Sequence, residues 1–211
     1  MTAIDATVFL ADDEPGMLKA LTRLLRAEGF TVQAFTSAKT FLESYRPEPL
    51  SCLVLDVAMP ELNGLKLQER LTRSGVLVPI VFLTGHGDIP MSVKAIKAGA
   101  VDFLTKPVKD GDLLRAVRAA LQRATEQREL ISEIALLRQR YASLTPRESE
   151  VMAHVVAGQL NKQIAGDLGI VERTVKAHRA RVMEKMGVVS LADLVRAAGR
   201  LGLGTPGIGN W

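Results

Sequence analysis

The stretch Cys52-Leu53-Val54-Leu55-Asp56 is a short apolar run that ends at a carboxylate. Near-continuous apolar runs of about four to six residues indicate strands buried on both faces, as in a parallel sheet. In an open α/β sheet the ligand site lies beyond the carboxyl ends of the strands. We therefore expect the polar side chain that ends this run to lie at the functional edge of a sheet.

Three more runs have the same form and end at a polar residue of their own. They are 7–11, followed by Asp12 and Asp13; 80–83, followed by Thr84; and 101–105, followed by Lys106. The carboxyl ends of parallel strands share one edge of the sheet, so three carboxylates, a hydroxyl and an ammonium should meet there.

Amphipathic segments separate the apolar runs, at 15–28, 37–45, 63–73, 89–98 and from 109 onward. This alternation predicts βαβ units, hence a parallel sheet with helices on both faces. Residues 32–35 supply a fifth, weaker strand. Five strands in the first 121 residues fit a flavodoxin-like (βα)5 doubly wound sheet, an α/β fold, in a domain spanning 1–121.

No glycine or proline interrupts the helical pattern from Leu113 to Arg140. From Leu130 to Leu144 the apolar residues step by three or four, which is the spacing of a coiled-coil seam. A single linker helix docked on a domain gives the same pattern. We assign 122–143 as a helical linker, and both interpretations stay open.

The second half carries the start and stop signals of four short helices. Thr145, Pro146 and Glu148 form a capping box at the first, Asn161 is expected to cap the second, and Ser190 starts the fourth. The expected helices cover 146–157, 162–168, 172–186 and 190–201. Four helices with a glycine turn between the second and third predict an all-α helix-turn-helix domain at 144–201. The glycine-rich residues 202–211, with Trp211, are expected to form a flexible tail.

Composition places the chain among soluble globular proteins, at 47% hydrophobic and 24% charged residues. It has no apolar stretch near the ~20 residues of a membrane span, and its first residues lack a secretion signal. We expect a cytoplasmic protein with no membrane partner. Its one cysteine, Cys52, cannot form an internal disulfide and is expected to be a buried small hydrophobe.

The two halves differ in charge. Residues 1–120 carry 14 Lys+Arg and 14 Asp+Glu, whereas residues 144–211 carry 9 and 6. A basic C-terminal domain beside a neutral one indicates a polyanion, such as DNA, as the partner of the former.

Asp12, Asp13 and Asp56, once brought together, would repel one another and resist joint ionisation. A bound cation removes that penalty, and hard oxygen ligands at few protein positions suit Mg²⁺. With its charge neutralised, Asp56 can attack a phosphoryl group and form an aspartyl phosphate. Lys106 would then compensate charge, and Thr84 would hydrogen-bond a phosphoryl oxygen.

Residues 5–121 resemble the receiver domain of two-component response regulators. The matching strings are LADDE at 10–14, LDVAMP at 55–60, LTGHGD at 83–88 and KAGAVDFLTKP at 97–107. The resemblance implies that a sensor histidine kinase phosphorylates Asp56. It also implies an Mg²⁺ site at Asp12 and Asp13 with the backbone carbonyl of Ala58.

The same resemblance implies that Thr84, Lys106 and an aromatic switch at Phe103 report the phosphate, and that the Lys106–Pro107 bond is cis. Phe103 lacks the hydroxyl of the tyrosine often found there, so its switching would rest on packing. Ala58 offers no polar side chain beside the phosphate, and we hypothesise that Ala58 and His86 set the phosphate lifetime.

Residues 144–201 resemble the helix-turn-helix domain of LuxR-type regulators, the NarL/FixJ subfamily of response regulators. The matching strings are LTPRE at 144–148, NKQIA at 161–165 and ERTVKAH at 172–178. The third helix is cationic and of a size that fits a major groove. The expected DNA contacts are Lys162, Arg173, Thr174, Lys176, His178, Arg179 and Arg181.

Together these features predict a transcription factor that is phosphorylated on Asp56, dimerises and binds promoter DNA, with RNA polymerase as a further partner. The resemblance implies a dimer face near 96–101, and the helix over 113–140 could add a second contact. One alternative is a DNA-binding regulator whose degenerate receiver ignores phosphate. Another is an aspartyl-phosphate hydrolase, although Ala58 stands where such enzymes usually carry a second aspartate.

Overall fold

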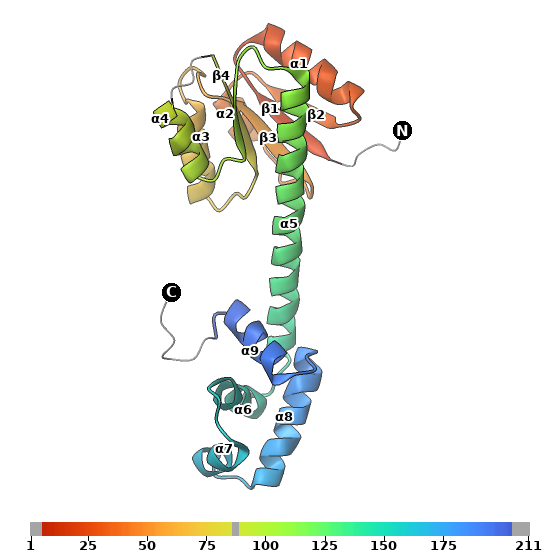
Figure 1. Cartoon of the computed structure of the whole chain (residues 1–211), viewed down its shortest axis with the longest axis vertical. Coiled ribbons are helices and arrows are strands. Elements are labelled where there is room, and N and C mark those ends of the chain that lie inside the picture. Colours follow the sequence, from red (N-terminus) through yellow and green to blue (C-terminus); the bar gives the residue numbers. More distant parts are fainter. Residues whose placement is uncertain (1–5, 86–88, 204–211) are drawn as a thin grey trace. The chain divides into compact units, whose positions relative to one another are not determined.

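The computed structural model describes residues 6–85 and 89–203. The chain divides into two compact units, residues 1–128 and 129–211, and the border falls inside the continuous helix α5 (Asp110–Ala142). Each unit is a fold of its own (Figure 1). The domain borders expected from the sequence stay predictions.

The first unit is built on a five-stranded parallel sheet with the strand order β2-β1-β3-β4-β5. Its strands are β1 (Thr7–Ala11), β2 (Thr31–Phe35), β3 (Ser51–Asp56), β4 (Ile80–Thr84) and β5 (Asp102–Thr105). Three of the four apolar runs form the central strands β1, β3 and β4. The fourth run, 101–105, forms the half-buried edge strand β5, and the weaker run forms the other edge strand, β2. The flavodoxin-like doubly wound sheet is therefore confirmed.

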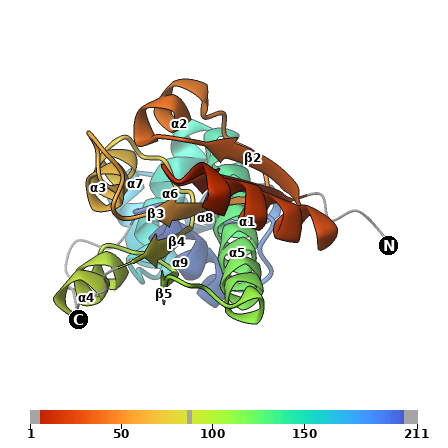
Figure 2. The same cartoon turned by 90° about the horizontal axis from the view of Figure 1, so that it is seen from above.

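Helices cover both faces of this sheet (Figure 2). They are α1 (Pro15–Ala27), α2 (Ala38–Ser44), α3 (Gly64–Arg73), α4 (Ile89–Lys97) and the first part of α5. Helices α1 and α5 bury one core, and α2, α3 and α4 bury the other. On α1 the buried Leu18, Leu21 and Leu25 recur at helical spacing, and burying such a side chain stabilises the fold by about 1.5–3 kcal/mol.

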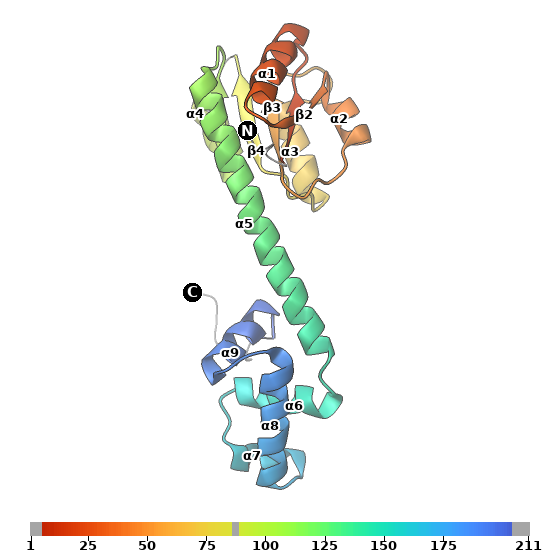
Figure 3. The same cartoon turned by 90° about the vertical axis from the view of Figure 1, so that its right-hand side faces the viewer.

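The second unit gathers α6 (Pro146–Val156), α7 (Asn161–Leu168), α8 (Glu172–Met186) and α9 (Leu191–Arg200) around one core (Figure 3). The capping box is present, since Thr145 Oγ1 accepts from Glu148 N and Glu148 Oε2 accepts from Thr145 N. Gly169 ends α7 with φ +64°, a left-handed conformation that favours glycine. The predicted helix-turn-helix is confirmed.

The expectation that Asn161 caps the second helix was wrong by one residue. Leu160 is the N-cap and Asn161 is already helical. The backbone N–H of Leu160 donates to the side chain of Gln163, 2.8 Å away, so the helix start does not need Asn161. The side-chain oxygen of Asn161 instead accepts from Arg179 of α8.

The last turns of α5 belong to the second unit, where Leu137 and Tyr141 pack on its core. The docked linker helix therefore describes this end of α5, and the coiled-coil seam, which needs a second chain, stays a prediction. Leu130 and Ile131, one to two turns earlier, are about half exposed, at 50% and 53%. Among the residues described, no helix combines the length and hydropathy needed to cross a bilayer.

Candidate functional site

The polar residues singled out by the sequence stand at neighbouring strand ends of the first unit. Asp56 and Thr84 are the last residues of β3 and β4, and Asp12 and Lys106 directly follow β1 and β5. The strand register aligns Ala11 with Leu55, and Asp56 with Leu83. The predicted convergence at one sheet edge is what the strand pairing produces.

Lys106 joins two of the carboxylates. Its Nζ donates to Oδ2 of Asp12 at 2.6 Å and to Oδ2 of Asp56 at 2.8 Å. Both carboxylates are buried, and the lysine side chain is only 14% exposed. Their other oxygens are also held, because Asp12 Oδ1 accepts from Glu14 N and Asp56 Oδ1 accepts from Ala58 N.

This arrangement sets the charge on Lys106. Burial by itself lowers the pKa of its ammonium group, but the hydrogen bonds and charges of Asp12 and Asp56 outweigh that effect and raise the pKa. The lysine is therefore a fixed positive charge at neutral pH, opposite two buried negative ones. Truncating Lys106 would leave the buried carboxylates without their shared counter-charge.

The site has the donor set of a hard cation. One carboxylate oxygen from each of Asp12, Asp13 and Asp56 lies within 4.8 Å of the others. Asp13 is exposed whereas the other two are buried. Oxygen ligands of this kind, open to solvent on one side, suit Mg²⁺, which keeps waters and shares phosphate oxygens. The three aspartates fit the ion; the backbone carbonyl of Ala58 as a further ligand stays a prediction.

The remaining receiver residues surround this cluster. Thr84 is buried, and its backbone oxygen accepts from Lys106 N at 2.7 Å. Phe103 is half-buried, with its ring centroid 6.0 Å from that of Phe82. The expected cis bond between Lys106 and Pro107 is present. His86 lies outside the described residues.

Sequence reasoning missed Gly64, the first residue of α3. A Cβ atom there would lie 2.5 Å from the backbone oxygen of Asp56 and 3.1 Å from Cα of Val57. Gly64 N also donates to Val57 O at 3.0 Å. The missing side chain thus lets α3 begin against the chain that carries Asp56. A glycine directly after the N-cap residue Asn63 was the available signal.

It also missed Gln68, a buried amide on α3. Its Nε2 donates to the backbone oxygens of Ala95 and Ala98, at 3.3 and 3.2 Å. Ala95 lies in the last turn of α4 and Ala98 directly follows that helix, so Gln68 connects α3 to the end of α4. Nothing in the spacing of the sequence pointed to this contact.

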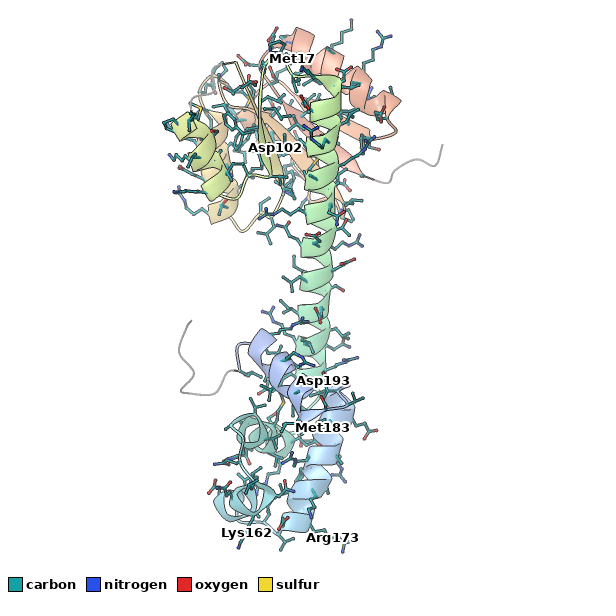
Figure 4. The ribbon with its side chains drawn as sticks, viewed as in Figure 1. Met17, Asp102, Lys162, Arg173, Met183 and Asp193 are labelled. Carbon is teal, nitrogen blue, oxygen red and sulfur yellow. The ribbon has the colours of Figure 1, made fainter. Side chains whose placement is uncertain are left out.

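The second unit presents a basic face on α8. Arg173, Lys176 and Arg181 are exposed there, and Lys162 is exposed on α7. Figure 4 labels Lys162 and Arg173, which lie at the same end of this unit and extend away from it. An exposed cationic helix of a helix-turn-helix matches the requirements of a major-groove reader.

The other predicted DNA contacts are less open. Thr174, His178 and Arg179 are half-buried. Within the described part of the chain, Nδ1 of His178 is buried and has no hydrogen-bond partner. Arg179 is engaged by Asn161 at 2.8 Å. These three residues lie on the flanks of α8, between its inward and outward faces.

Two protein families match the chain. Residues 8–118 match the response regulator receiver domain, and residues 142–198 match the family of bacterial regulatory proteins named after luxR. The two matches coincide with the sheet unit and with the helix-turn-helix unit.

Curated relatives span nearly the whole chain. The response regulator protein TodT of Pseudomonas putida is 48% identical over 93% of this chain and 86% of its own length. Nodulation protein W of Bradyrhizobium diazoefficiens is 49% identical over 94% of this chain and 87% of its own. The transcriptional regulatory protein FixJ of Azorhizobium caulinodans is 42% identical over 90% of both.

Solved structures of response regulators are similar to this chain over nearly its whole length. The response regulator StyR, 48% identical, superposes with a TM-score of 0.79 over 93% of this chain and 100% of its own. Full-length FixJ from B. japonicum, 40% identical, gives 0.57 over 93% of this chain and 97% of its own.

Proposed function

The chain belongs to the NarL/FixJ-type response regulators, which join a receiver domain to a LuxR-type DNA-binding domain, and from this premise we propose that Asp56 is its phosphoacceptor. The protein is a phosphorylation-dependent regulator of transcription. The observation that carries our assignment is the contact of Lys106 with both Asp56 and Asp12 at the sheet edge.

In this proposal an oxygen of Asp56 attacks the phosphorus atom of a phosphohistidine on the sensor kinase. A P–O bond forms as the P–N bond breaks, and the imidazole nitrogen keeps the electron pair and takes up a proton. Lys106 stays beside the reacting carboxylate and balances the added charge. Thr84, buried at the end of the next strand, would donate to a phosphoryl oxygen.

Mg²⁺ bound at this edge would neutralise the carboxylates and the phosphoryl oxygens. Asp12, Asp13 and Asp56 supply the side-chain oxygens, and we assign the backbone carbonyl of Ala58 as a further ligand. Asp13, the exposed member, leaves a solvent-facing side through which the phosphodonor can approach.

The phosphate then acts as a signal within the chain. Phosphorylation of Asp56 adds charge and hydrogen-bond acceptors beside Lys106 and Thr84, which biases the receiver between two states. Phe103 would follow by repacking against Phe82, since it has no hydroxyl to exchange partners. A receiver that no longer responds to phosphate would be expected to have lost Asp56, Thr84 or Lys106. All three are present in this chain, which argues against that alternative.

Our proposed DNA contacts are the exposed basic residues of the helix-turn-helix, namely Arg173, Lys176, Arg181 and Lys162. Lys162 and Arg173 would hold phosphates and so position α8, while side chains on its outward face read base edges. We propose promoter DNA as the partner, RNA polymerase as a further partner, and the cytoplasm as the location of the protein.

We propose that phosphorylation brings two copies together through α4 and its surroundings. Ile89 is 79% exposed, and Val93 and Ile96 are also exposed on this helix. Leu130 and Ile131 of α5 offer a second apolar surface for the same partner. Burying such side chains in a dimer would recover the free energy lost to their exposure.

The assignment of Asp56 is tested by incubating the full chain with a small phosphodonor and Mg²⁺ and locating the phosphoryl group by mass spectrometry. We expect one phosphoryl group on Asp56 and none on Asp56→Asn. Asp102→Asn is the matched control, because Asp102 is a second aspartate of the receiver outside the cluster. A phosphoryl group elsewhere in the chain would contradict the assignment.

A further inference from the structure

Asn161 and Arg179 link the two helices of the helix-turn-helix. The side-chain oxygen of Asn161, on α7, accepts from Nη1 of Arg179, on α8, at 2.8 Å. Asn161 is not the N-cap of α7. That position is Leu160, whose backbone N–H donates to the side-chain oxygen of Gln163. Its amide is therefore committed to the arginine.

Arg179 lies on the flank of α8. Val175 and Val182, four residues before it and three after it, are buried, while Lys176 and Ala180 are exposed. Arg179 itself is half-buried. A side chain at such a position borders both the protein core and whatever occupies the outward face of the helix.

The partner of Arg179 is a neutral side chain, the amide of Asn161. Arg147, Arg196 and Arg200 each pair with a carboxylate, as does Lys185. In the described ranges, no carboxylate forms an ion pair with Arg179. An amide oxygen fixes the guanidinium without cancelling its charge, whereas an aspartate would fix it and cancel it.

We propose that Asn161 is a positioning residue for DNA binding, which holds the Arg179 guanidinium in place with its charge intact so that it meets a backbone phosphate. The inference rests on the proposed DNA-binding role of α8. Ordering the arginine beforehand removes the entropy cost of fixing a long side chain on binding. DNA affinity should thus depend on Asn161 only through Arg179.

The test uses the phosphorylated full chain and a duplex that the wild type enriches from a random-sequence pool. Affinity for that duplex is measured by fluorescence anisotropy, and melting temperature by circular dichroism. The variants are Asn161→Ala, Asn161→Asp, Arg179→Met and the double variant Asn161→Ala with Arg179→Met. Gln163→Glu is the control for charge alone, since it adds a negative charge to the same turn and keeps the N-cap acceptor.

We expect Asn161→Ala to weaken binding roughly 3- to 10-fold, the cost of ordering one long side chain, and to have no further effect once Arg179 is Met. Asn161→Asp should keep or raise the melting temperature, because the ion pair replaces a neutral bond, yet weaken binding more than both Asn161→Ala and Gln163→Glu. If the contact between Asn161 and Arg179 only stabilised the fold, the DNA affinities of the variants would instead rise and fall with their melting temperatures.

Additive losses in the double variant, or an affinity of Asn161→Asp that follows its stability, would overturn the inference. If the wild type enriches a duplex and Arg173→Ala weakens binding but Arg179→Met does not, the inference fails and the proposed function stands. If the phosphorylated wild type enriches no duplex, both fail.

Discussion

The Nζ atom of Lys106 lies 2.8 Å from Oδ2 of Asp56, although the two residues stand at the ends of strands that β4 separates in the sheet. A long side chain thus spans the sheet edge to the proposed phosphoacceptor. A phosphoryl group at Asp56 would replace one negative charge with nearly two. The ammonium group of Lys106 is placed to pair with Asp56 in both its free and its phosphorylated form.

Lys106→Met is expected to destabilise the first unit by about 3 kcal/mol without Mg²⁺, because it leaves two buried carboxylates uncompensated. Mg²⁺ should then restore stability to this variant by more than it stabilises the wild type. Urea denaturation with and without Mg²⁺ measures both effects. Lys109→Met, at an exposed lysine nearby, is the control, and equal Mg²⁺ stabilisation of Lys106→Met and wild type would refute this view of the charge balance.

Gly64→Ala is expected to destabilise the chain by about 1–3 kcal/mol and to slow phosphorylation, since the new Cβ would overlap the backbone oxygen of Asp56. Gly111→Ala is the matched control, because a Cβ at that helical position would meet nothing within 4 Å. Urea denaturation and the rate of labelling by a small phosphodonor provide the two readouts. Identical behaviour of the two variants would show that the close approach at Gly64 is unimportant.

The pH dependence of the second unit should contain a contribution from Glu148. A hydrogen bond from Lys185, followed by one from the Thr145 backbone, lowers the pKa of Glu148 to about 2. In the unfolded chain its pKa would be about 4.3. The stabilisation is therefore fully present above about pH 4.3 and is lost as the pH falls towards about 2.

Accordingly, the melting-temperature difference between wild type and Glu148→Gln should be largest near neutral pH and shrink across that acidic window. Glu150→Gln, on an exposed residue of the same helix, should show no comparable trend. A difference between wild type and Glu148→Gln that stays constant down to about pH 2.5 would contradict the role of this ion pair.

Much of the fold could be predicted from the sequence because a polar residue follows each apolar run. Asp56 and Thr84 mark strand ends, and parallel pairing turns that linear pattern into one cluster. Thr145 and Glu148 were predictable for a similar reason, since a capping box is made within four consecutive residues. Local spacing determined each of these features.

The contacts of Gly64, Gln68 and Asn161 could not be predicted, because they join residues whose proximity depends on how the helices and strands pack. Gly64 matters because α3 begins against the end of β3, and Gln68 because α4 ends beside α3. Asparagine is a common N-cap residue, and the sequence therefore predicts that Asn161 caps α7. In the structure Leu160 is the N-cap, its N–H donates to Gln163, and the side-chain oxygen of Asn161 accepts from Arg179. Side chains with several possible partners are assigned only when the chain is folded.

We propose that a phosphoryl group on Asp56 controls DNA binding, and the ratio of the DNA affinities with and without phosphorylation measures this control. The full chain is treated with a small phosphodonor and Mg²⁺ and titrated against a duplex that it enriches from a random-sequence pool. We predict tighter binding by the phosphorylated wild type, no change for Asp56→Asn, and weak binding by Arg173→Ala in either state. Equal affinity of the wild type with and without the phosphodonor, once phosphorylation of Asp56 is verified by mass spectrometry, would contradict the claim.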